Sequence, residues 1–323
     1  MLRVAAFLFS GLLLPLTALE PSEPSRVAIE AAAARAVGSH DPDPFTRNPD
    51  WLAAPLLSLQ ELTLIFNHPI NRSVDQDPRI SVQDPDVLPL VRLNTVRTRF
   101  IDDRLRSAVQ AGATQVVILS AGFDTRAYRF RPLLEKVKVF EVDRSATQAV
   151  KQRRIHDVFG VFPPNTRYVP FEPQRDKLAD VLRRAGFEPA ARSFFIWEGG
   201  SIYQSAAVVR AILTDIAQSK ASSLVIDFAF ADAVKRVRQD PASPQERFDA
   251  AWGEPWLFGI PEQPGAEAYF SELGFETVEL LPVDSPIAAR RYLTHRDQTI
   301  VGQGLDLRDA VPLKLAELVA RRN

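Results

Sequence analysis

From residue 88 onward the chain alternates between short apolar runs and longer amphipathic runs, and this alternation restricts the possible folds more than any other feature. Strands that alternate with helices predict a mostly parallel sheet with helices on both faces. The runs indicate strands at 115–121, 138–143, 167–172, 194–198, 224–230, 277–283 and 290–295. They indicate helices at 88–110, 145–159, 176–185, 206–219, 231–237 and 266–273.

The last two predicted strands have no helix between them. They should therefore form a hairpin, which makes one of the seven strands antiparallel. Before residue 88, the Ala-rich run "RVAIEAAAARAVG" predicts a helix over 26–38 that ends at a glycine. The proline- and aspartate-rich stretch from Asn67 to Pro89 predicts a long surface loop, and such loops often cover binding sites.

The first twenty residues, "MLRVAAFLFSGLLLPLTALE", form an apolar leader. Arg3 followed by an apolar run resembles the start of a signal peptide. The run is shorter than the roughly 20 residues of a membrane-spanning helix, and Pro15 interrupts it. A cleaved signal, a membrane-lying segment, a start-site artefact and a true span all stay open, and the leader is kept out of the fold prediction.

Charge and residue counts exclude several classes of protein. Lys and Arg number 39 against 40 Asp and Glu, so the chain lacks the basic surplus of a nucleic-acid-binding protein. Cysteine is absent, which excludes disulfides, thiolate ligands and a cysteine nucleophile. The four histidines are far apart in the sequence, so we expect no metal site.

The stretch "VVILSAGFDT" places a small-residue turn directly after a buried strand. In open α/β sheets, ligands bind at the carboxyl ends of the strands, where this turn should lie. A dinucleotide fold needs G-x-G-x-x-G around its pyrophosphate, whereas this turn has Ser120, a single glycine at Gly122 and a carboxylate at Asp124. The carboxylate would repel an anion, so the positively charged S-adenosylmethionine fits the turn better.

The strand "KVFEVD" ends in two acidic residues, Glu141 and Asp143, which are 19 and 21 positions beyond Gly122. This is close to the spacing at which an acid binds ribose hydroxyls. Asp143 also precedes the helix predicted from Ser145, so a helix-capping role is the alternative.

The next two predicted strands end in Glu172 and Glu198. Because the carboxyl ends of parallel strands meet at one edge of a sheet, these acids should point into the same cleft. Polar residues also collect at strand ends simply because the ends meet solvent, and this alternative stays open.

The helix over 88–110 carries Arg97 and Arg104 within its apolar sector. A buried arginine needs a carboxylate partner. That partner is either an internal acid or, for Arg97, the carboxylate of a bound methionine group.

These segments together resemble the leucine carboxyl methyltransferase family, and most closely its bacterial branch of S-adenosylmethionine-dependent methyltransferases. The matching pieces run in family order over about 24–203; they are "PSRVAIEAAAARAVGSHDPDPF", "VRTRFIDD", "VVILSAGFDTRAYRF", "VFEVDRSATQAVKQRR", "YVPFEPQRDKL" and "FFIWEGGSIY". The resemblance implies a class I methyltransferase (Rossmann-like) fold with S-adenosylmethionine as cofactor. It implies a helical lid region over 21–87 and a methyltransferase domain over 88–323.

By motif position the resemblance also implies cofactor contacts. It places Arg97 at the cofactor carboxylate, Gly122 in the cofactor turn, Asp143 at the ribose, Glu172 near the adenine and Glu198 near the methionine end. The family usually has glycine at position 120, and it usually has aspartate where this chain has Glu172 followed by Pro173. Ser120 narrows the approach to the ligand, and Pro173 removes a backbone donor.

Three functions follow as hypotheses. The first is O-methylation, on a carboxylate or hydroxyl, of a small molecule, with Tyr203 either orienting the acceptor or simply packed. The second is a catalytically degenerate binding protein whose cofactor site is spoiled by Ser120 and Pro173. The third is a NAD-dependent oxidoreductase, which the missing glycines disfavour. A cytosolic cofactor favours a cytoplasmic protein, whereas the leader resembles a signal peptide or anchor.

Overall fold

The computed structural model describes residues 23–62, 89–219, 221–239, 253–301 and 313–321. Its centre is a seven-stranded sheet with strand order β3-β2-β1-β4-β5-β7-β6. The strands are β1 (Gln115–Leu119), β2 (Lys138–Asp143), β3 (Thr166–Pro170), β4 (Ser193–Trp197), β5 (Ser223–Ala229), β6 (Phe275–Pro282) and β7 (Leu313–Ala320). Only β7 runs antiparallel to its neighbours, β5 and β6, which confirms the predicted fold class.

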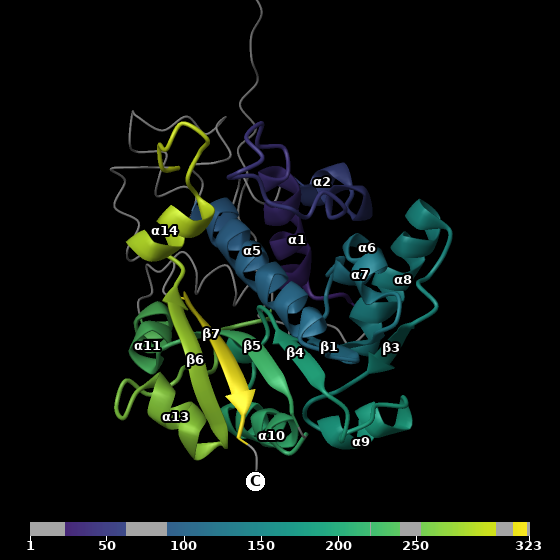
Figure 1. Cartoon of the computed structure of the whole chain (residues 1–323), viewed down its shortest axis with the longest axis vertical. Coiled ribbons are helices and arrows are strands. Elements are labelled where there is room, and N and C mark those ends of the chain that lie inside the picture. Colours follow the sequence, from purple (N-terminus) through teal and green to yellow (C-terminus); the bar gives the residue numbers. More distant parts are fainter. Residues whose placement is uncertain (1–22, 63–88, 220, 240–252, 302–312, 322–323) are drawn as a thin grey trace, which may run out of the picture.

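Helices cover both faces of this sheet (Figure 1). They are α1 (Arg26–Gly38), α2 (Leu59–Leu62), α5 (Pro89–Gln110), α6 (Arg126–Arg129), α7 (Arg131–Leu134), α8 (Ser145–Phe159), α9 (Leu178–Arg184), α10 (Ala206–Ala217), α11 (Ala231–Gln239), α13 (Ala266–Glu272) and α14 (Pro286–Tyr292). Two short 3-10 turns, η1 (Ala54–Leu56) and η3 (Ser201–Tyr203), complete the described elements.

The predicted strand at 290–295 is wrong, because this part of the chain is helix α14. Ser285 caps that helix by accepting a hydrogen bond from the backbone N–H of Ala288, and Pro286 is fixed in a conformation that suits a first helical turn. The seventh strand is β7 instead, so the chain still ends its sheet in an antiparallel pair.

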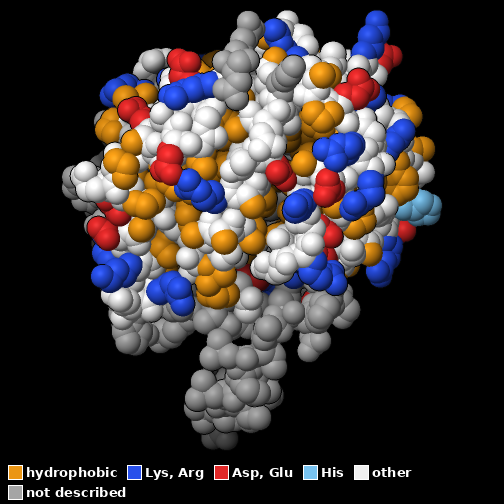
Figure 2. Space-filling model, turned by 90° about the horizontal axis from the view of Figure 1, so that it is seen from below, with side chains coloured by type: hydrophobic (Ala, Val, Ile, Leu, Met, Phe, Trp, Pro, Cys, Tyr) orange, Lys and Arg blue, Asp and Glu red, His pale blue; other side chains and the backbone are white. Residues whose placement is uncertain are grey.

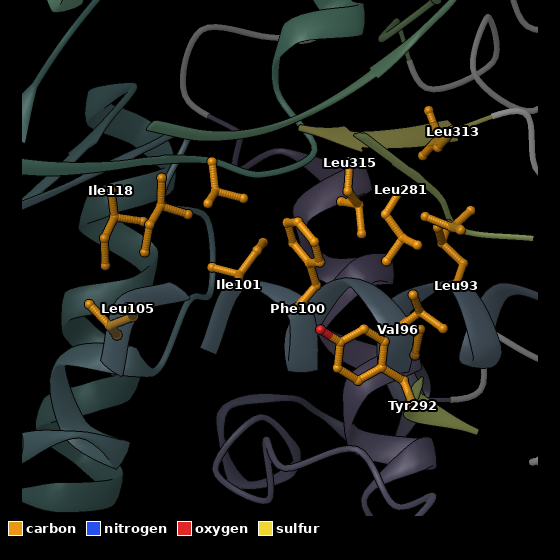
Figure 3. Close-up of a cluster of buried hydrophobic side chains, with 14 of the residues drawn as sticks. Leu93, Val96, Phe100, Ile101, Leu105, Ile118, Leu281, Tyr292, Leu313 and Leu315 are labelled. Atoms are coloured by element: carbon orange, nitrogen blue, oxygen red, sulfur yellow. The ribbon is translucent and has the colours of Figure 1, made fainter. Parts of the chain in front are cut away.

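Helix α5 packs its apolar stripe against one face of the sheet (Figure 3). Leu93, Val96, Phe100 and Ile101 are at most 7% exposed, as the predicted apolar sector requires. Figure 3 shows them facing side chains of β1, β6 and β7, including Ile118, Leu281 and Leu315. Residues of the other sheet face form a second cluster with α9, α10 and α13.

The two ends of the sheet differ in their surroundings. Strand β7 points to the bottom of Figure 1, so the parallel strands point upward, toward α1 and the start of α5. The surface at the other end of the sheet is seen from below in Figure 2, and it carries basic and acidic side chains interspersed with apolar ones. The site expected at the carboxyl ends of the strands therefore lies on the side of α1.

Candidate functional site

The turn after β1 is hydrogen-bonded to the end of β2, through a backbone bond from Ala121 to Val142 and a short bond to a side chain. The backbone N–H of Gly122 donates to Oδ2 of Asp143 at 2.6 Å. Gly122 has a positive φ of 40°, and a Cβ at this position would lie 2.9 Å from the Cβ of Ala28 in α1. Only glycine fits here without movement, because the backbone is left-handed and a helix lies against it.

Asp143 faces the turn after β1 and does not cap α8. Its other oxygen, Oδ1, accepts the N–H of Arg144 at 2.6 Å, and α8 has no side-chain cap at its first turn. Burial raises the pKa of Asp143, although these two backbone donors oppose the shift. The alternative that Asp143 caps α8 is therefore wrong. Its carboxylate lies at the end of β2, beside the glycine turn.

Glu141 is completely buried and lies under this turn. Its Oε2 is 2.5 Å from Nζ of Lys151, an α8 residue that is 1% exposed. Burial raises the pKa of Glu141 to about 7 despite that ammonium group. Lys151 also reaches the carbonyl oxygen of Ala121 at 3.5 Å, so the pair supports the turn from below. Of the two acids predicted for the ribose, Asp143 is the one placed at the strand end.

Arg97 is held by internal acids, which was one of its two predicted environments. Its Nε lies 3.0 Å from Oε1 of Glu198, and its Nη1 donates to Oδ2 of Asp227 at 2.8 Å. Its Nη2 donates to Oδ1 of Asn94 at 2.8 Å. Arg104 is likewise paired internally, with Glu279 and Glu317. The assignment of Arg97 to the cofactor carboxylate stays a prediction.

Glu198, at the end of β4, connects Arg97 to a second arginine that the sequence analysis missed. Nη1 of Arg126 lies 2.7 Å from Oε2 of Glu198 and also contacts the carboxylate of Asp124. Burial alone would raise the pKa of Glu198, but Arg126 and Arg97 lower it to about 2. Glu198 is therefore a fixed anion at neutral pH.

Behind Arg126, the ion pairs continue into the N-terminal part of the chain. Asp102 of α5 lies 2.8 Å from Arg126 Nε and 2.7 Å from Arg129 Nη1. Asp50 lies 3.3 Å from Arg129 Nε and 2.8 Å from Arg35 Nε. These side chains are at most 8% exposed, so α1, α5 and α6 are joined by buried ion pairs.

The remaining predicted residues lie at the ends of β3 and β4. Glu172 and Pro173 lie in the turn after β3, and no hydrogen bond or ion pair engages the Glu172 carboxylate within the described residues. The backbone N–H of Glu172 donates to Asp176 at 2.8 Å. Tyr203 lies in η3 and packs against the core cluster on the α5 side, in agreement with a packed aromatic. An acceptor-orienting role for Tyr203 stays a prediction.

Residues 253–262, which we call the strap, cross the same end of the sheet. Oε2 of Glu254 accepts the N–H groups of Arg26 and Val27, at 3.0 and 3.1 Å, at the start of α1. The strap then binds the carbonyl of Ile202 through two backbone N–H groups, and Ile260 pairs with Phe230 after β5. Residues 240–252, which precede the strap, and nearly all of the predicted loop at 67–89 lie outside the described residues.

Within the described ranges, no group of three or more His, Asp or Glu side chains is arranged to hold a metal ion. In the same ranges, no helix is both long and apolar enough to cross a bilayer. The predicted leader lies outside them.

Two solved structures resemble this arrangement over nearly the whole chain. One is a crystal structure from Thermobifida fusca, provisionally described as a methyltransferase, with a TM-score of 0.53, 16% identity, and coverage of 94% of this chain and 96% of that one. The other is a DUF574 family protein from Streptomyces avermitilis, with a TM-score of 0.52, 13% identity, and coverage of 90% and 97%. At these identities they support the fold alone, which is that of the class I methyltransferases.

Sequence relatives identify the family. A protein from Mycolicibacterium gilvum is 37% identical over 182 residues, covering 54% of this chain and 56% of its own length. One from Parafrankia sp. is 31% identical over 204 residues, covering 60% and 64%. Both are provisionally named S-adenosyl-L-methionine-dependent methyltransferases, and this chain spans less than two thirds of either. The profile described as "Leucine carboxyl methyltransferase" matches residues 28–217, and the chain belongs to that family.

Proposed function

We propose that this chain is an S-adenosylmethionine-dependent methyltransferase that methylates an oxygen of a small molecule, with a carboxylate as the favoured acceptor. The observation that carries the proposal is the hydrogen bond from the Gly122 backbone N–H to the Asp143 carboxylate. A glycine turn after β1 lets the protein backbone come close to a nucleoside, and a carboxylate at the end of β2 can accept hydrogen bonds from its ribose hydroxyls. Membership of the family supports the same cofactor.

The charged side chains around this hydrogen bond suit a positively charged nucleoside. Three carboxylates, those of Asp124, Glu198 and Asp227, contact two guanidiniums, those of Arg97 and Arg126, and the Asp143 carboxylate lies beside Gly122. The excess of negative charge attracts a sulfonium and an amino group. It opposes the pyrophosphate of NAD, which disfavours the oxidoreductase hypothesis.

The acceptor class follows from the lack of a suitable base among the residues that the structure describes. S-adenosylmethionine would supply a methyl group activated by a positively charged sulfur. Glu198, with a pKa of about 2, is a poor base. The described histidines lie elsewhere: His40 contacts the carbonyl of Ala36, His156 is exposed, and His295 contacts Asp43. A carboxylate acceptor already carries the attacking lone pair, so no residue has to remove a proton.

Positioning is then the main task of the protein. Arg97 and Arg126 stay charged among buried acids and hold the Glu198 carboxylate in one position at the end of β4. Backbone hydrogen bonds fasten the strap to η3, and in this proposal the two segments keep water from that end. A dry site favours the reaction of a carboxylate with a sulfonium, since the opposite charges of the reactants cancel as the ester forms.

Calorimetric titration of the purified chain with S-adenosylhomocysteine tests the proposal. We expect binding that D143A weakens about tenfold or more, because each hydrogen bond from a ribose hydroxyl is made to a charged acceptor. E188A is the matched control, since Glu188 is an exposed acid paired with Lys138 at the opposite end of β2 from Asp143. Absence of binding would refute the proposal and favour the degenerate binding protein, and NAD binding in its place would favour the oxidoreductase.

A further inference from the structure

Ser120 has a backbone conformation that a serine rarely adopts. Its φ of 51° lies in the left-handed region, and its side chain is exposed at the carboxyl end of the central strand β1. The family resemblance implies glycine at this position, and glycine adopts this conformation without steric strain. Strained residues cluster at functional sites, and Ser120 lies at the strand end where ligands bind in such sheets, so we ask what its hydroxyl contacts.

The Ser120 side chain extends toward the turn that follows β4. A Cβ on Gly200 would lie 2.6 Å from Nε1 of Trp197 and closer still to Oγ of Ser120. Position 200 therefore has to be glycine because Ser120 occupies the space beside it. The hydroxyl stands between the turns after β1 and β4, and no residue in the described part of the chain is hydrogen-bonded to it.

Arg97 lies beside the same turn, but its charge is already cancelled. A Cβ on Gly199 would lie 3.4 Å from Nη1 of Arg97. The guanidinium is bound by Glu198 and Asp227, so this trio carries one negative charge in excess. A ligand carboxylate at this place gains little from Arg97, because the neighbouring acids repel it as strongly as the arginine attracts it. The Ser120 hydroxyl differs from Arg97 in that no acid of the described residues binds it, so its hydrogen can be donated to a ligand.

We propose, on the basis of the proposed function, that the Ser120 hydroxyl donates a hydrogen bond to the carboxylate of the cofactor's methionine group. Ser120 then makes the contact that the family resemblance assigns to Arg97, and Arg97 serves to hold Glu198 and Asp227 in place. The serine that replaces the family's glycine is thus a binding residue, and its strained backbone is the cost of placing that donor.

Two ligands separate this contact from the rest of the site. S-adenosylhomocysteine has the amino-acid carboxylate, and 5′-methylthioadenosine has the same nucleoside and sulfur without it. By calorimetry, we expect S120A and S120G to weaken S-adenosylhomocysteine about tenfold, since a hydrogen bond to a charged group is lost. The affinity for 5′-methylthioadenosine should stay within about twofold of wild type.

A matched control removes the effect of backbone strain. Ala221 also has a left-handed φ, 52°, in the exposed turn before β5. S120G and A221G should both raise the melting temperature, because glycine relieves the strain at each position, but only S120G should lose affinity for S-adenosylhomocysteine.

The outcomes are distinct for the two proposals. If wild type binds neither ligand, the proposed function fails. If wild type binds S-adenosylhomocysteine and S120A binds it equally well, or loses affinity for both ligands to the same extent, the role of Ser120 is refuted.

Discussion

Gly122→Ala tests how closely α1 approaches the turn after β1. The substitution places a methyl group 2.9 Å from the Cβ of Ala28, at a residue whose φ is 40°. Gly160→Ala is its control, because Gly160 also has a left-handed φ, 69°, but nothing lies within 4 Å of an added Cβ. The two variants share the backbone cost and differ in the steric contact.

The expected magnitudes follow from these geometries. A non-glycine residue in the left-handed region costs about 1–2 kcal/mol, which is the whole loss expected for Gly160→Ala. Carbon atoms in ordinary contact are about 3.5–4.0 Å apart, so the overlap with Ala28 forces α1 to move and adds about 1–3 kcal/mol. Movement is restrained because Glu254 and Thr147 hold the start of α1. Gly122→Ala should therefore lose about 2–5 kcal/mol.

Urea unfolding measures both losses, and a double-mutant cycle isolates the contact. Ala28→Gly removes the opposing methyl group at a helix-propensity cost of about 1 kcal/mol. In the double variant the steric part should disappear, giving a favourable coupling of about 1–3 kcal/mol. Equal losses for Gly122→Ala and Gly160→Ala, with a coupling below about 0.5 kcal/mol, would show that α1 does not press on this turn.

Three further predictions concern buried charges and the strap. Asp102→Asn should destabilise by about 3–5 kcal/mol in urea, because two buried arginines lose their shared partner, whereas Asp103→Asn on the exposed side of α5 should cost less than about 1 kcal/mol. The pKa of Glu141 rises from 4.5 to about 7 on folding. The native state thus binds more protons between those pH values, so stability should fall by about 3 kcal/mol as pH rises through this window, and Glu141→Gln should remove that decline. Glu254→Ala should speed hydrogen exchange at the first amides of α1 and cost about 1 kcal/mol, and unchanged exchange would refute the link to the strap.

The strand ends that form the site could be predicted from the sequence, because a short local pattern identifies each of them. An apolar run followed by an acid fixes both the strand and the side chain at its tip, and Asp143 and Glu198 lie where that pattern put them. The apolar sector of α5 was readable for the same reason, since one helix face is enough to define it.

The strand β7 was not readable. Its sequence "LKLAELVA" has apolar residues at spacings that suit both a helix and a strand, so periodicity cannot decide. It becomes a strand because β5 and β6 offer hydrogen-bonding edges on both sides. The helix at Pro286–Tyr292 shows the reverse case, where a local cap outweighed an apparent strand pattern.

By itself, the sequence determined the alternating architecture, the acids at the strand tips and the need of Arg97 for a carboxylate, because each depends on neighbours within a few residues. The tertiary structure decided which carboxylates Arg97 meets, since Asp227 is 130 positions away. It also decided that Ser120 faces Gly200, that Ala28 closes on Gly122 and that Glu254 holds the start of α1. Such contacts depend on how elements that are distant in the sequence pack together. A local sequence pattern does not predict which distant charge or methyl group will contact a given residue.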